Sequence, residues 1–274
     1  MKKRKIVFAA FVCVFLAQSY QAVGQFTSEE VAEREKWEEF LKTAEVVETR
    51  DIGDGVTLPL RVFLEKDGLE TSGVWKNIKG MHQGYLEGWQ YEIAAYEMDK
   101  LVGLNMIPPT VERKVKGLTG SLQLWIEHDY NLQDLVKKKI KIPSLKVVQI
   151  QKLNYLVRAF DSLIANEDRH QRNVIFTGDW RMILIDHSRT FRFKMKFANR
   201  LVYGKRGLLG RKLFKRLPQT FVEKVEELDK KKVQEAVGAY LTNMEMQGIM
   251  IRKKLLLKEI EEMIKEQGRD KVLY

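Results

Sequence analysis

The chain has 274 residues, of which 45% are hydrophobic and 31% are charged. This length allows one large domain or two lobes around a cleft, and the composition excludes a chain without a buried core. The only cysteine, Cys13, lies in an N-terminal apolar run, which excludes disulfides, thiolate metal sites and a cysteine nucleophile from the rest of the chain. The net charge is +11, and four of these charges lie in residues 2–5, which leaves +7 on the remainder.

Residues 1–24 have the pattern of a secretory signal peptide. Residues 2–5 are all basic, residues 6–17 form an apolar run of twelve, and Ala22 and Gly24 are small residues at the spacing of a cleavage site. A membrane span needs about 20 apolar residues, so we expect a cleaved signal, with an uncleaved signal anchor as the alternative. In both cases the domain is exported to a periplasm, the medium or a secretory-pathway lumen. No membrane span is expected in the mature chain that remains after the signal is cleaved.

Residues 25–43 are predicted to form an amphipathic lead-in helix, because Trp37, Phe40 and Leu41 form one apolar stripe. The next region, 44–127, has the pattern of short strands with tight turns, interrupted by one helix. The predicted strands are 44–51, 60–64, 72–76, 111–116 and 121–127, and the helix spans about 89–101. This region is predicted to be a small antiparallel β lobe.

Residues 128–274 are predicted to form a larger, mainly helical lobe. Helices are expected at 143–165, 222–230, 231–241 and 243–266. Between the first two helices, two short strands at 174–177 and 182–185 are separated by Gly178-Asp179, which is a hairpin signal. The predicted fold class is therefore α+β with two lobes.

Polar side chains gather between the long predicted helix and the end of this hairpin. Asp168-Arg169-His170 is followed by Asn173, and the second strand of the hairpin ends in Asp186. Phosphoryl transfer needs a carboxylate near the attacking hydroxyl, oxygen ligands for a metal, and a cation on the phosphates. An Asp followed five residues later by Asn is the arrangement of a kinase catalytic loop. The hairpin folds the chain back, so that Asn173 and Asp186 can face one Mg²⁺.

The run Asp-Arg-His-x-x-Asn followed by Ile-Asp resembles the atypical kinases, namely the phosphatidylinositol kinases, the HipA kinases and the Fam20-type kinases of the secretory pathway. In the phosphatidylinositol kinases the metal motif is Asp-Phe-Gly, whereas here it is Asp186-His187-Ser188. The resemblance covers about residues 44–265 and is most specific in 161–192. It implies a two-lobed protein-kinase-like fold, with ATP and Mg²⁺ or Mn²⁺ as cofactors.

The same resemblance implies roles for the residues of the catalytic loop. Asp168 would orient and deprotonate the acceptor hydroxyl, while Asn173 and Asp186 would hold the metal. His170 would assist proton transfer or steady the γ-phosphate, or else it packs beneath the loop and orients Asp168.

The resemblance also makes demands on the β lobe. A strand lysine, Lys76, would bind the phosphates, with Glu92 of the following helix as its partner. The turn that contains Gly53 and Gly55 would cover the phosphates, unless it is only a hairpin turn. Main-chain groups of the strand that leads to the hinge would meet the adenine, at Trp125, Ile126 and Glu127. Trp125 as an ordinary core residue is the alternative.

The segment 189–216 carries most of the local charge asymmetry. Between His187 and Val222 there are eleven Lys and Arg residues and no acidic residue. By resemblance to kinases this stretch lies across the substrate entrance. Its cations, with Phe191, Phe193, Phe197 and Tyr203 interleaved, would attract phosphate, an acidic peptide or anionic lipid headgroups. A solubilising surface loop is the alternative. Nucleic acid is not the expected partner, because no nucleic-acid motif accompanies the charge.

These observations predict an exported ATP-dependent kinase of the atypical class that transfers the γ-phosphate to a protein or lipid-like hydroxyl. The alternative is a catalytically inactive kinase-fold module that binds a nucleotide or an anionic ligand. The altered metal motif at 186–188 and the scarcity of ATP outside the cytoplasm favour that alternative.

Overall fold

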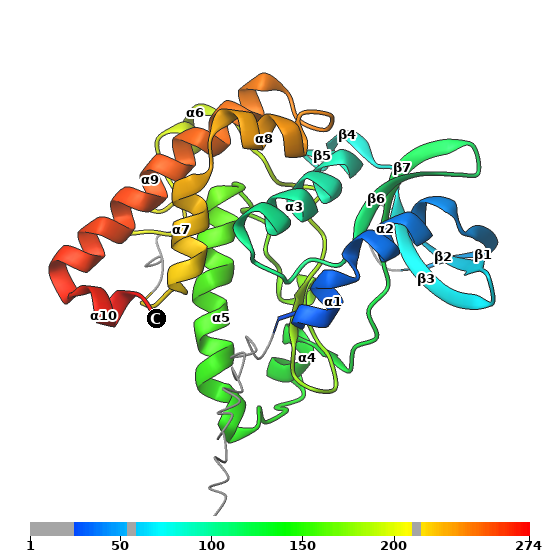
Figure 1. Ribbon diagram of the computed structural model, residues 1–274, viewed down its shortest axis with the longest axis horizontal. Helices are drawn as coiled ribbons and strands as arrows, with labels where there is room; N and C mark the ends of the chain where they lie inside the picture. Colours follow the sequence, from blue (N-terminus) through cyan, green and yellow to red (C-terminus); the bar gives the residue numbers. More distant parts are fainter. Residues whose placement is uncertain (1–24, 54–58, 210–214) are drawn as a thin grey trace, which may run out of the picture.

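Two lobes, one rich in strands and one mainly helical, make up the structure (Figure 1). This computed structural model describes residues 25–53, 59–209 and 215–274, so the predicted signal peptide 1–24 and Gly55 lie outside the described residues. The mixed α+β class with an antiparallel sheet is confirmed. None of the helices within the described ranges is long and apolar enough to cross a membrane.

The strand-rich lobe is built on a five-stranded antiparallel sheet with the order β1-β2-β3-β7-β6. Its strands are β1 (Glu45–Asp51), β2 (Leu60–Lys66), β3 (Leu69–Lys76), β6 (Thr110–Val115) and β7 (Leu118–Leu124). The last of these ends before the predicted boundary at Glu127. Successive side chains of a strand point to opposite faces. Trp75 therefore enters the apolar core with Phe40 and Leu41, whereas the neighbouring Lys76 points away from it.

A second hairpin, which the sequence did not predict, separates β3 from the helix of this lobe. It consists of β4 (Lys79–His82) and β5 (Tyr85–Gly88), and α3 (Trp89–Val102) follows directly. The backbone N–H of Gly88 donates to the carbonyl of Ser188 at 3.0 Å. This bond places the hairpin and the start of α3 against the segment that follows Asp186.

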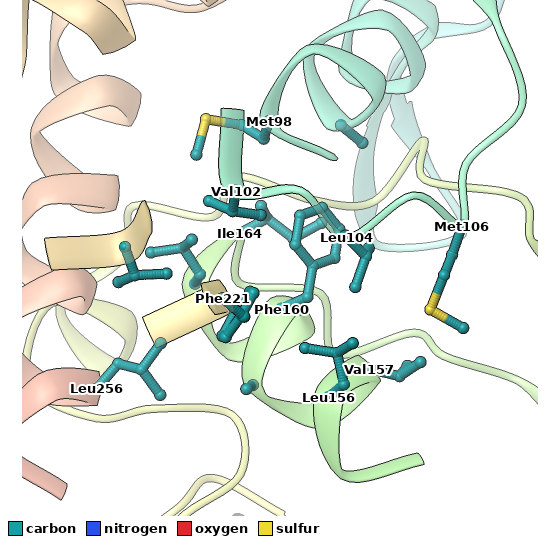
Figure 2. Packing of buried hydrophobic residues seen from close by; sticks show 14 of the residues in the cluster. Met98, Val102, Leu104, Met106, Leu156, Val157, Phe160, Ile164, Phe221 and Leu256 are labelled. Atoms are coloured by element: carbon teal, nitrogen blue, oxygen red, sulfur yellow. The ribbon is translucent and has the colours of Figure 1, made fainter. Parts of the chain in front are cut away.

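The helical lobe packs around α5 (Ser144–Leu163), which runs through the middle of Figure 1. Its other elements are β8 (Tyr130–Asn131), α4 (Leu132–Lys137), η1 (Gln171–Asn173), β9 (Val174–Phe176), β10 (Met182–Leu184), α6 (Met195–Ala198), α7 (Gln219–Glu227), α8 (Lys230–Val237), α9 (Asn243–Gln267) and α10 (Arg269–Val272). Figure 2 shows Phe160 of α5 among Met98 and Val102 of α3 and Phe221 of α7. The helix of the β lobe thus contributes to the core of the helical lobe.

The lead-in is two helices rather than the single predicted one, and it contacts both lobes. Glu30 of α1 (Ser28–Ala32) pairs with Arg181 of the hairpin formed by β9 and β10. In α2 (Arg34–Thr43), Nη2 of Arg34 lies 2.7 Å from Oδ1 of the fully buried Asp99 in α3. The lead-in therefore extends from the helical lobe to the helix of the β lobe.

Candidate active site

Three residues that are far apart in the sequence meet at one point. Lys76 ends β3, Glu92 lies in the first turn of α3, and Asp186 follows β10. Nζ of Lys76 lies 2.7 Å from Oε1 of Glu92 and 2.9 Å from Oδ1 of Asp186. Glu92 is buried, whereas the side chain of Asp186 is 40% exposed. The structure thus brings the predicted phosphate-binding pair together with one predicted metal ligand.

Lys76 and Glu92 stay ionised although both side chains are buried. Burial by itself would lower the pKa of Lys76, but the carboxylates of Asp186 and Glu92 outweigh it and hold that pKa above its ordinary value. Burial would likewise raise the pKa of Glu92, but the charge of Lys76 and, after it, the side chain of His187 hold it below its ordinary value. Both side chains are therefore charged at neutral pH, and Lys76 keeps the positive charge that a phosphate ligand needs.

His187, the second residue of the predicted metal motif 186–188, is fully buried. Its backbone N–H donates to Oε2 of Glu92 at 2.8 Å, and its Nε2 lies 2.8 Å from Nη2 of Arg169. A guanidinium only donates, so Nε2 accepts. The proton of the neutral ring then sits on Nδ1, which is 3.7 Å from Oε2 of Glu92. Burial, and after it the charge of Arg169, lower the pKa of His187, in agreement with a neutral ring.

Arg169 braces the catalytic loop. Its Nε and Nη2 donate to the two carboxylate oxygens of Asp161 in α5, at 3.2 and 2.9 Å, and Asp161 is fully buried. Its Nη1 donates to the carbonyls of Ile185 at 3.0 Å and Asn173 at 3.3 Å. Holding these two carbonyls fixes the segment of Asn173 beside the strand end that carries Asp186.

The donor atoms of Asn173 and Asp186 suit Mg²⁺. The backbone N–H of Ile185 donates to the carbonyl of Asn173 at 3.2 Å, so the two predicted ligands lie on facing segments. Within the described residues no group of three or more His, Cys, Asp or Glu is placed to hold a metal by itself. A site at Asn173 and Asp186 would depend on phosphate oxygens as well, which is the usual arrangement for Mg²⁺ with a nucleotide.

Both carboxylate oxygens of Asp168, the predicted base, have partners. Oδ1 lies 2.6 Å from Nε2 of His170, and Oδ2 lies 3.2 Å from Nη1 of Arg189. The side chain of His170 is 64% exposed, so the alternative that it packs beneath the loop is wrong. The ring of His170 instead contacts Asp168 from the solvent side.

The positions that we predict to face adenine lie between β7 and β8. The backbone N–H of Trp125 donates to the carbonyl of Ser72 at 2.9 Å, so this amide is engaged in the sheet. The carbonyl of Ile126 lies 3.0 Å from Nδ1 of His128, and the side chain of Glu127 is exposed. Trp125 is partly exposed, and its buried Nε1 has no hydrogen-bond partner among the residues that the structure describes. Contact of this segment with adenine stays a prediction.

The glycine turn can be followed only in part. Gly53 has a φ of 74°, a conformation that favours glycine, whereas Gly55 lies outside the described residues. A covering role for this turn stays a prediction.

The basic segment is divided between the core, ion pairs and free cations. Phe191, Phe197 and Tyr203 are buried, so the expectation of an aromatic surface between the cations is wrong for these three residues. Arg189 and Arg192 are also largely buried, and Lys196 pairs with Glu167 at 3.0 Å. Five cations of the described part of the segment have no ion pair or side-chain hydrogen bond to any described residue: the largely buried Arg192, and Lys194, Arg200, Arg206 and Lys215.

Sequence reasoning missed Glu87, and it treated Arg189 only as one member of the basic segment. It also assigned no role to the side chain of His187, although this ring lies inside the site. One signal of these buried contacts was available in the sequence. Asp161 is an acidic residue on the apolar face of a predicted core helix, and a buried charge there requires a partner, which is Arg169, the residue that contacts His187.

No protein-family model matches the sequence, and neither does any curated protein. Among solved structures, the fold is similar to the crystal structure of the proinflammatory kinase CtkA of Helicobacter pylori, with a TM-score of 0.50. The two sequences are 11% identical, and the match covers 83% of this chain and 97% of the other. Because the identity is so low, the likeness shows the fold alone. The chain therefore has a two-lobed, kinase-like fold.

Proposed function

We propose that this protein is an exported, ATP-dependent phosphotransferase of the atypical kinase class, acting on a hydroxyl group of a protein or lipid-like acceptor. The observation that carries the proposal is the meeting of Lys76, Glu92 and Asp186, at 2.7 and 2.9 Å, from three separate elements. Phosphoryl transfer requires a cation for the phosphates and a carboxylate near the attacking hydroxyl. Lys76, held in its charged form between two carboxylates, supplies the cation, and the loop from Asp168 to Asn173 supplies the carboxylate.

In the proposed reaction, the acceptor hydroxyl oxygen forms a bond to the γ-phosphorus of ATP. The bond from the γ-phosphorus to the bridging oxygen breaks, ADP leaves, and the hydroxyl proton passes to the carboxylate of Asp168. Lys76 neutralises phosphate charge, and Glu92 holds it in place. Mg²⁺ or Mn²⁺, held by Asn173 and Asp186, would balance the remaining charge of the triphosphate when bound. His170 lies within contact of Asp168 and would have a secondary role.

An anionic acceptor suits the basic segment. Arg200 and Arg206 form no ion pair with any described residue, and they line a hollow of about 470 Å³ together with Lys258, Glu259 and Glu262 of α9. Lys205, in the same loop, already pairs with Glu266 of α9. An acidic peptide or an anionic headgroup would supply the counter-charge that these free cations lack.

Export is proposed from residues 1–24, which have the signal-peptide pattern. A protein delivered outside the cytoplasm meets little ATP, so the inactive module stays the second candidate. The observation that favours it is that both oxygens of Asp168 are engaged, by His170 and Arg189.

Purified protein that begins at Gln25 would be incubated with ATP labelled at the γ-phosphate, with Mg²⁺ or Mn²⁺, and with acceptors in matched acidic and neutral forms. We expect metal-dependent transfer of label, greater to the acidic acceptor or to anionic vesicles than to their neutral counterparts. A shift in melting temperature with ATP and metal, but no transfer of label, would favour the inactive module. Neither a shift nor transfer would contradict the proposed function.

Glu92→Gln is expected to raise the KM for ATP about tenfold, because the amide has one oxygen, and with that oxygen on the N–H of His187 the charge-assisted hydrogen bond from Lys76 is lost. The amide oxygen of Gln can still accept from the N–H of His187, so the fold should be retained. The measurement is the initial rate as a function of ATP concentration. Glu97→Gln in the same helix is the matched control, since Lys100 is the one ion-pair partner of Glu97 within the described ranges. Equal KM values for the two variants would contradict the role of Glu92.

A further inference from the structure

The guanidinium of Arg189 is held on three sides, directly beside the proposed base. Its Nε and Nη2 donate to Oε1 of Glu87, at 2.8 and 2.6 Å. Its Cζ lies 4.7 Å from the ring centre of Tyr85, on the same strand β5. The remaining nitrogen, Nη1, lies 3.2 Å from Oδ2 of Asp168. The arginine is thus fixed on the hairpin and directs its last donor to the catalytic loop.

Glu87, the carboxylate that binds Arg189, is itself buried. Its side chain is only 1% exposed, and its second oxygen lies 3.4 Å from the hydroxyl of Ser188. A buried carboxylate needs a charged partner, and Arg189 is the one ion pair of Glu87 among the described residues. The attraction of Glu87 and Asp168 also outweighs partial burial and keeps the pKa of Arg189 above its ordinary value.

The two oxygens of Asp168 are held very differently. Oδ2 faces an arginine whose side chain is 17% exposed and anchored elsewhere. Oδ1 faces the ring of His170, which is 64% exposed and has no other side-chain partner among the described residues. An incoming hydroxyl group can displace the exposed ring far more readily than the anchored guanidinium.

We propose that Arg189, anchored by Glu87, is a positioning residue that fixes Asp168 through Oδ2 and leaves Oδ1 as the atom that receives the acceptor proton. This inference rests on the proposed function. It assigns to the β4–β5 hairpin a task in the reaction, because the hairpin supplies Glu87. If Arg189 only connected the two lobes, its ion pair with Glu87 would be sufficient, and the contact of its Nη1 with Asp168 would not be needed.

The test compares Arg189→Met with wild-type protein in the phosphate-transfer assay. We expect kcat to fall by about tenfold to a hundredfold with the KM for ATP unchanged, because a mispositioned base affects the transition state and not nucleotide binding. Arg189→Lys should recover part of the loss. Glu87→Gln should lower kcat as well, and the double variant should be no slower than Arg189→Met alone, since both changes remove one unit.

Arg181→Met is the matched control. Arg181 is 20% exposed and is likewise shared by two carboxylates, those of Glu30 and Asp179. We expect it to leave kcat unchanged and to lower the melting temperature less than Arg189→Met does, because Glu30 and Asp179 are exposed whereas Glu87 is buried. An unchanged kcat in Arg189→Met, or equal losses of kcat in Arg189→Met and Arg181→Met, would overturn the inference while the proposed function stands. Wild-type protein that transfers no label would overturn both.

Discussion

Asp186→Asn is expected to abolish metal-dependent transfer, with a fall in kcat of about a thousandfold, while the protein stays folded. A metal ion contributes several kcal/mol to charge stabilisation in such a reaction, and each 1.36 kcal/mol is about a factor of ten in rate. Asparagine is the appropriate replacement. The φ of Asp186 is 59°, and aspartate and asparagine adopt this left-handed conformation more readily than other side chains do.

The measurement is the rate of label transfer across a range of Mg²⁺ concentrations, together with the melting temperature. Lys76 keeps its contact with Glu92 at 2.7 Å in this variant, so the site should not collapse. Asp179→Asn, in the turn of the neighbouring hairpin, is the control for the loss of one carboxylate and should retain its rate. Unchanged turnover in Asp186→Asn would remove Asp186 from the metal site.

Asp168→Asn is expected to lower kcat by about a hundredfold to ten-thousandfold, the range associated with loss of a general base. The amide keeps the shape of the carboxylate but cannot accept the hydroxyl proton. ATP binding should persist, because Lys76, Glu92 and Asp186 are unaffected. The measurements are single-turnover transfer and the shift in melting temperature with ATP and Mg²⁺.

Two further variants make this prediction specific. Glu167→Gln removes the neighbouring carboxylate, which pairs with Lys196 at 3.0 Å, and should leave kcat within a few-fold of wild type. His170→Ala should reduce the rate much less than Asp168→Asn, since its ring is largely exposed. The reverse order would make His170 the base and Asp168 its partner.

The order of chemical groups along the chain was predictable, because it is a local pattern. The catalytic loop between a long helix and a hairpin indicated Asp168, Asn173 and Asp186. The kinase resemblance then indicated the lysine at the end of a strand and the glutamate at the start of the next helix. The structure brings Lys76 and Glu92 together at 2.7 Å, as that reasoning required.

Pairings made only in the tertiary structure were not predictable. Glu87 and Arg189 are separated by 102 positions, and the hairpin that carries Glu87 exposes Met81, Tyr85 and Leu86. Its apolar residues therefore show no core-facing alternation from which strands could be inferred. The burial of His187 could not be predicted either, because a lone histidine gives no sign of its partners. In the basic segment the surrounding cations hid the fact that Phe191 and Phe197 are core residues.

The lead-in helices carry a consequence for nucleotide recognition. The pair of Glu30 and Arg181 reaches the helical lobe, and the pair of Arg34 and Asp99 reaches the helix that carries Glu92. The strap thus adds to the other connections between the lobes, which include the chain that follows β7 and the packing of α3 on the helical lobe, and it restricts their relative rotation. A site held in this way is preorganised: much of the entropy lost in bringing the lobes together is lost on folding, and not again each time a ligand binds.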